Sequence, residues 1–175
     1  MKTIDQTVEM LDTEQQRVVT AIRSLGERAW TDTCLARGAR ATLADRGHFA
    51  LDPDELDFTA QEITGHLCDS ATVFGARIKV IREVELPSFG DFDTAAAGRR
   101  ERYRSMSFDA ALDRLIWTFQ YLRAQVVQID ADDFGREGLH EHTGEMSIAQ
   151  IVEFLPGHLA DHVAQLRAVS ASASA

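Results

Sequence analysis

Cysteine, net positive charge and long apolar runs are all scarce in this sequence, and each shortage excludes a class of protein. The two cysteines, Cys34 and Cys68, could pair, but they form no zinc motif and a cytosolic chain keeps its thiols reduced, so we interpret both as ordinary thiols. No stretch approaches the roughly 18 consecutive apolar residues of a membrane span, and the first residues lack the apolar core of a signal peptide. We therefore expect a cytoplasmic protein without a membrane partner.

Positive charge is also in short supply, because the formal net charge is -10. Nucleic-acid binding depends on clustered lysine and arginine, so a nucleic-acid partner is not expected. The one basic run, residues 99–104, precedes an expected helix start and could steer an anionic ligand. Such runs are more often simply solvated, and that is what we expect of this one.

What the sequence does contain is typical of a globular protein. Its 175 residues are 45% hydrophobic and 26% charged, which fits one domain with a sizeable core. We expect this domain to span residues 1–169, with residues 170–175 forming a frayed tail of alanine and serine.

Apolar residues recur at three- and four-residue steps in four segments, which predicts four amphipathic helices. The first, third and fourth predicted helices span residues 4–25, 108–129 and 148–169, and the second starts between residues 53 and 59 and runs to about 84. Ser107 and Ser147 are the expected N-caps of the last two helices. Residues 27–56 show no sustained period and allow one short helix near 33–43. With no segment of strand period, the pattern favours an all-α four-helix bundle, in which the gap before the third long helix allows a crossover.

Two histidines on the fourth predicted helix carry the clearest chemical signal. His158 and His162 stand four residues apart, hence about 40° around the helix and about 6 Å along it, so both can reach one metal ion. They lie within the apolar stripe and should project into the bundle. Taken alone this spacing is a weak signal, because ordinary core or surface histidines share it.

A third histidine changes that balance. His66 lies in the apolar stripe of the second long helix, where a leucine or isoleucine would be expected. Because a bundle directs side chains from facing helices toward one centre, His66, His158 and His162 can form a three-nitrogen site for one divalent metal ion. Neutral imidazoles suit zinc, nickel, copper or iron. The alternative is a metal-free bundle in which the histidines hydrogen-bond to one another and to the backbone.

Pro156 lies two residues before His158, inside the fourth predicted helix. A proline there removes one backbone hydrogen bond and predicts a kink, which could direct the two histidines toward the metal. The alternative is a shorter helix that begins at Pro156.

Two segments resemble the DinB superfamily, including its YfiT-like branch of metal-dependent hydrolases. They are Glu62-Ile63-Thr64-Gly65-His66-Leu67 and Met146-Ser147-Ile148-Ala149-Gln150 leading into His158-Leu159-Ala160-Asp161-His162. The resemblance implies an up-down-down-up bundle, often a homodimer, in which the three histidines bind zinc or nickel at an open pocket for a small-molecule substrate. It also implies a possible low-molecular-weight thiol cofactor such as mycothiol. The related mycothiol-dependent isomerases usually have a carboxylate where His158 stands here.

Three protein ligands leave a coordination position open, which is typical of a catalytic site. The ion could activate water for hydrolysis or a thiol for transfer or isomerisation, and the sequence does not choose between them. A non-catalytic metal-binding or stress-associated module is the alternative, and a fourth protein ligand closing the site would favour it.

Other polar and aromatic residues are weaker candidates for the site. Glu62, Asp69, Glu153 and Asp161 stand near the histidines, but most of them are expected to be solvated and none is assigned as catalytic. His140 and His142 would both face the pocket if their connection were extended, although a polar loop is usually just exposed. The aromatic residues Trp30, His48, Trp117 and Tyr121 could line the pocket, although such residues usually belong to the core.

Overall fold

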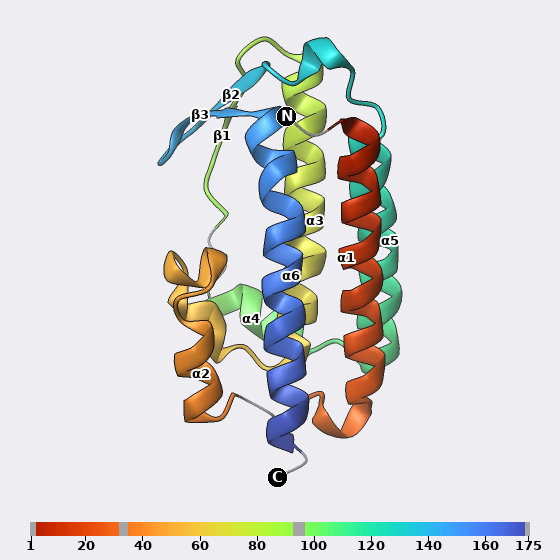
Figure 1. Ribbon diagram of the computed structural model, residues 1–175, viewed down its shortest axis with the longest axis vertical. Helices are drawn as coiled ribbons and strands as arrows, with labels where there is room; N and C mark the ends of the chain where they lie inside the picture. The colour runs from red at the N-terminus through yellow and green to blue at the C-terminus, as the bar shows by residue number, and fades with distance from the viewer. Residues whose placement is uncertain (1–2, 32–34, 93–96, 174–175) are drawn as a thin grey trace.

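Four long helices form the body of the computed structural model, which describes residues 3–31, 35–92 and 97–173 (Figure 1). The long helices are α1 (Ile4–Leu25), α3 (Ala60–Glu83), α5 (Phe108–Val126) and α6 (Ile148–Ala173). α1 and α6 run in one direction and α3 and α5 in the other, because the chain crosses the length of the bundle between α3 and α5. The predicted up-down-down-up four-helix bundle is therefore confirmed.

Polar side chains at the helix starts explain where the helices begin. Thr3 and Thr59 cap α1 and α3, each in a capping box with the residue three positions later. Ser107 accepts a hydrogen bond from the backbone of Ala110 and caps α5, as predicted. The Ser147 hydroxyl accepts one from the Gln150 backbone at the start of α6.

The connections contain more structure than the sequence predicted. The short helix α2 (Arg37–Leu43) lies where the sequence allowed one, near residues 33–43, whereas α4 (Ala97–Arg104) was not predicted. Both flank the bundle. A small sheet of β1 (Ser88–Phe89), β2 (Glu137–His140) and β3 (Gly144–Ser147) covers one end, with β1 parallel to β2 and β2 antiparallel to β3. These strands are two to four residues long, too short to show a period-two pattern in the sequence.

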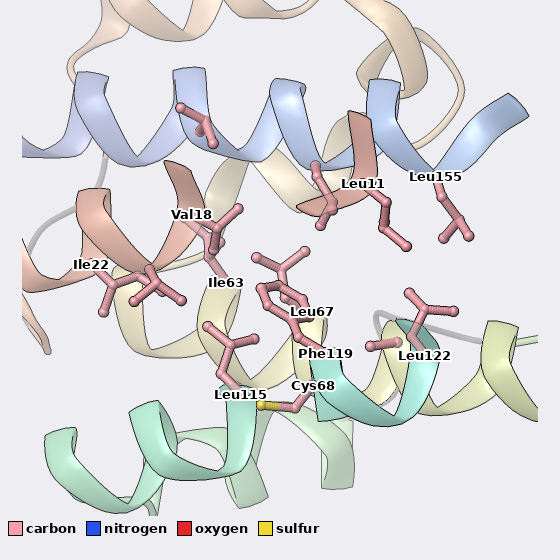
Figure 2. Close-up of a cluster of buried hydrophobic side chains, with 14 of the residues drawn as sticks. Leu11, Val18, Ile22, Ile63, Leu67, Cys68, Leu115, Phe119, Leu122 and Leu155 are labelled. Atoms are coloured by element: carbon pink, nitrogen blue, oxygen red, sulfur yellow. The ribbon is translucent and has the colours of Figure 1, made fainter. Parts of the chain in front are cut away.

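The core lies between the four long helices, and all four contribute to it (Figure 2). The labelled side chains belong to α1 (Leu11, Val18, Ile22), α3 (Ile63, Leu67, Cys68), α5 (Leu115, Phe119, Leu122) and α6 (Leu155). Burial raises the pKa of the Cys68 thiol to about 12, which keeps it protonated and unreactive. Cys34 lies outside the described residues.

α6 continues through Pro156, so the alternative of a helix beginning at that proline is wrong. It also extends to Ala173, into the segment that we expected to fray. No helix among the described residues is both long and apolar enough to cross a membrane.

The basic run at residues 99–104 lies within α4 and docks this helix onto α3. Arg100 and Arg104 bind Glu62, whereas Arg99 binds Asp69 at 3.2 Å. The other donors to Asp69 are Arg102, Tyr103 and Arg114. We call Glu62, Asp69 and these six partners the arginine–carboxylate cluster. The expectation of a merely solvated run was wrong, because the carboxylates of α3 pair with it.

One glycine makes this docking possible. Tyr103 is buried against Gly65, where an added Cβ atom would lie 2.3 Å from the tyrosine ring. Only glycine lets the ring approach the α3 backbone this closely.

Candidate metal centre

The structure brings together the three histidines singled out from the sequence. His66 on α3 and His158 and His162 on α6 are buried, with ring centroids 4.7–5.4 Å apart. The Nε2 atoms of His66 and His158 lie 3.2 Å apart. Two nitrogens bound to one tetrahedral zinc ion at its usual bond lengths would lie about 3.3 Å apart, so this spacing suits a shared ion.

A glutamine sets the protonation of His162. Gln165 Nε2 donates to the backbone carbonyl of Glu55 at 2.7 Å, so its Oε1 is left to accept from His162 Nδ1 at 2.9 Å. The proton of neutral His162 is therefore on Nδ1, and the Nε2 lone pair is free for a metal. Among the described residues, His162 Nε2 has no hydrogen-bond partner although it is buried. Buried nitrogens without partners are rare and call for a missing ligand.

A carboxylate that the sequence did not single out faces the same point. Glu55 belongs to the 3₁₀ turn η3 (Pro53–Asp57) and is buried. Its Oε1 lies 3.8 Å from His66 Nε2, and its Oε2 lies 3.5 Å from His162 Nε2. No signal in the sequence separates Glu55 from its acidic neighbours, because only the fold of this turn buries it.

His48 holds Glu55 in place. It lies on the 3₁₀ turn η2 (Gly47–Ala50), and its Nε2 is 2.9 Å from Glu55 Oε2. Its Nδ1 is 3.2 Å from Asp161 Oδ2, so a carboxylate engages each ring nitrogen. His48, Glu55, His158 and His162 offer ligand atoms that all lie within 4.8 Å of one another. We call these four residues and His66 the histidine centre.

Asp161 is held close to the turn by Gly47. This glycine has a φ of +44°, and an added Cβ would lie 1.8 Å from Asp161 Oδ2. Asp161 also accepts from the His48 backbone at 3.2 Å. The expectation of solvation was wrong for Asp161, whereas Glu153 is exposed.

Electrostatics favour neutral imidazoles beside an ionised carboxylate. Burial lowers the pKa of His66 to about 3, even though the charge of Glu55 opposes the shift. Burial, followed by the neighbouring imidazoles, lowers the pKa of His158, and burial lowers that of His162. Burial alone would raise the pKa of Glu55, but the facing histidines, His66 above all, hold it well below its usual range. Metals bind the neutral form of histidine and the ionised form of glutamate.

The histidine centre opens into a cavity of about 350 Å³. His48, Glu55, His66 and His158 form part of its wall, so a ligand in the cavity can reach them. The remaining lining residues are Leu51, Asp52, Pro53, Asp54, Ser70, Phe74, Arg77, Asp91, Phe92 and Phe154.

The hairpin histidines are not among the residues that line this cavity, so the possibility that both would face it is not borne out. His140 lies on β2 against Phe89, and His142 is exposed in the turn that follows. An extended segment would have put both on one side, but the chain turns between β2 and β3.

Of the aromatic candidates, only His48 lines the cavity. Trp30 is buried against Phe108, and Trp117 is exposed and stacks on Tyr121. Glu62 and Asp69 belong to the arginine–carboxylate cluster, so they take no part in the histidine centre.

The comparisons with known proteins show the family of the chain and a solved structure with the same fold. The family model of the DinB superfamily matches residues 49–166, more than half of the chain. The chain belongs to the DinB superfamily. The matched region of this DinB chain contains Glu55 and the three histidines His66, His158 and His162, whereas His48 lies just before it.

A solved structure shares the fold of this DinB protein. YfiT from Bacillus subtilis is described as a probable metal-dependent hydrolase with an unusual four-helix bundle topology. The match has a TM-score of 0.76 at 16% sequence identity and covers 98% of this chain and 87% of YfiT. No curated protein sequence matches the chain.

Proposed function

We propose that this protein is a metal-dependent enzyme of the DinB type, in which His66, His158 and His162 hold one divalent ion. The observation that carries the proposal is the unpartnered Nε2 of His162, whose lone pair is fixed by the Gln165 hydrogen bond. The 3.2 Å spacing of the His66 and His158 nitrogens supports a shared ion. Hydrolysis and thiol-dependent transfer or isomerisation are the reaction classes that such a site serves.

When bound, the ion would supply Lewis-acid activation of a water or thiol. Glu55 is the protein group placed to hold a proton beside it. Its Oε2 is engaged by His48, whereas its Oε1 accepts no hydrogen bond from a described residue. His48 in turn is fixed by Asp161, so Glu55 keeps its orientation while a substrate enters the cavity.

The finer features of this function follow the family resemblance. We propose zinc or nickel as the ion, a low-molecular-weight thiol such as mycothiol as a cofactor, and a homodimer in the cytoplasm. A small-molecule substrate fits a cavity of about 350 Å³. The net charge of -10 disfavours a nucleic-acid partner.

The first experiment is elemental analysis of untagged protein, purified with and without incubation in zinc or nickel. We expect about one ion per chain, lost in His162→Ala and His158→Gln and retained in His142→Ala, which removes an exposed histidine outside the cavity. Circular dichroism establishes that the variants are folded. Wild-type protein that stays metal-free after incubation would overturn the proposal.

The position of Glu55 favours a second candidate, a non-catalytic metal-binding module. If Glu55 takes the last coordination position, the site is closed. The visible absorption of the cobalt-loaded protein separates the two candidates. A spectrum that changes on adding 2-mercaptoethanol indicates an open position and catalysis, whereas an unchanged spectrum in wild type that changes in Glu55→Gln indicates a site closed by Glu55.

A further inference from the structure

Arg77 is a buried cation without a matching anion. Only 7% of the residue is exposed, and it forms no ion pair with a carboxylate in the described ranges 3–31, 35–92 and 97–173. Its Nη2 donates to the backbone carbonyl of Gly90 at 2.8 Å. The Phe74 and Phe89 rings flank the guanidinium, with centroids 5.6 and 5.0 Å from its central carbon. Burying a charged arginine is costly unless it is paired. Its remaining donors are open to an acceptor in the cavity that Arg77 lines.

Asp91 is the acidic side chain that acts on Arg77, but it does not neutralise the charge of the arginine. Asp91 lies close enough to favour the charged form of Arg77, yet burial outweighs it and the pKa of Arg77 is lowered. Asp91 Oδ1 lies 3.5 Å from His140, and the Asp91 side chain is about half exposed, at 47%. By contrast, Arg82, one turn later on α3, binds Asp133 at 2.9 Å.

Arg77 and the histidine centre share one cavity. His66, Ser70, Phe74 and Arg77 all line it from α3. Their spacing of four, eight and eleven residues places them within about 80° of one another around the helix, and the Cα atoms of His66 and Arg77 lie about 16 Å apart along it. The rings of Phe74, Phe92 and Phe154 contribute an apolar wall. The cavity therefore combines a cation, aromatic walls and the histidine centre.

We propose that Arg77 binds the carboxylate of an elongated organic anion, whose apolar body lies against the aromatic wall and whose other end reaches the histidine centre. This inference rests on the proposed function, because it names the substrate class of the same site. A planar guanidinium binds a carboxylate through two parallel hydrogen bonds, which also fixes the orientation of the ligand. Asp52 and Asp54 repel an anion along their part of the wall, and Arg77 is the one lysine or arginine among the described lining residues, so the charged end is directed to Arg77.

The test uses 3-phenylpropionate and its neutral amide as probes, with binding measured by calorimetry on zinc-loaded and chelator-treated protein. We expect the acid to bind wild type at least tenfold more tightly than the amide. Arg77→Gln should remove this preference, Arg77→Lys should retain part of it, and Arg82→Gln, which changes a paired arginine on the same helix, should leave it unchanged.

The chelator-treated protein separates the two proposals. A preference for the acid that depends on Arg77 without metal supports the anion site, even if metal incorporation fails. A preference seen only with zinc, and equal in wild type and Arg77→Gln, means that the carboxylate binds the ion and overturns the inference. Equal affinity of the wild-type protein for the acid and the amide would by itself overturn the inference. If Asp91 is the true partner of Arg77, Asp91→Asn and Arg77→Gln will lower thermal stability alike without weakening acid binding.

Discussion

Two clusters of polar groups share α3, which contributes Glu62 and Asp69 to one and His66 to the other, and they are satisfied in different ways. In the arginine–carboxylate cluster every oxygen of Glu62 and Asp69 accepts at least one hydrogen bond. Arg99 Nε is the one side-chain donor of this cluster that is buried without a partner among the described residues. In the histidine centre, by contrast, it is an acceptor, the Nε2 lone pair of His162, that is buried without a partner among those residues. A buried cluster whose carboxylates are satisfied stabilises a fold, whereas one that leaves lone pairs unmatched is arranged for a ligand. The difference therefore assigns a structural role to the first cluster and a functional role to the second.

Metal removal should give the largest effect, and only at the histidine centre. If zinc is present at 1,000 times its dissociation constant, it should stabilise the wild-type protein by about 4 kcal/mol. Chelator should remove this increment in wild type and in Glu62→Gln, and His162→Ala should lack it from the start. Thermal unfolding with and without chelator measures the effect. If chelator still lowered the stability of His162→Ala, the metal effect would not belong to the histidine centre.

Glu62→Gln should lower the free energy of unfolding by about 2 kcal/mol, because it weakens charged hydrogen bonds to a buried group. Burial alone would raise the pKa of Glu62, but Arg100 and Arg104 hold it below its ordinary value of 4.5. The stabilisation is therefore complete above pH 4.5 and is lost as the pH falls through the lower pKa of the folded state. Urea unfolding of both proteins between pH 3 and 7 measures this. A difference that does not shrink in acid would contradict the role of the ionised carboxylate.

Gln165→Met should weaken metal binding about tenfold with a smaller effect on folding. Without the Gln165 side chain, the proton of His162 is no longer held on Nδ1. Competition with a coloured chelator measures the affinity. Gln150→Met is the matched control, since the exposed Gln150 side chain accepts from the Ser147 backbone at the start of α6, away from the histidines. Equal affinities in the two variants would show that the tautomer of His162 does not depend on Gln165.

Arg102→Ala should produce the smallest change, within about 0.5 kcal/mol, because a largely exposed ion pair contributes little. The Arg102 side chain is 64% exposed and lies 3.5 Å from Asp69, which retains three other donors. Urea unfolding again provides the measurement. A loss as large as that of Glu62→Gln would mean that the rim of the cluster contributes as much as its buried part.

The long helices and the convergence of three histidines could be predicted, because both depend on regular spacing. The apolar period placed His66 on the inner face of α3 and His158 and His162 on that of α6, and the structure brings the three rings together. Their role as metal ligands stays a prediction. Glu55 and His48 could not be predicted as partners, because they lie on 3₁₀ turns where no period shows which side chain is buried.

The role of the basic run was missed for a related reason. The sequence shows six consecutive residues rich in arginine, but not that α4 folds back on α3. Glu62 and Asp69 pair with arginines 30 to 45 residues away, and no local pattern reveals such contacts. Gly65 opposite Tyr103 is part of the same long-range fit.

The histidine centre also has a consequence for the order in which this chain can mature. The contact between His66 and His158 closes a loop of 92 residues, and Gln165 reaches back 110 residues to Glu55. A nascent chain still lacking α6 contains His48, Glu55 and His66 but neither of the other two histidines. The centre thus appears only after α6 has left the ribosome and docked, so its assembly marks the completion of the four-helix bundle.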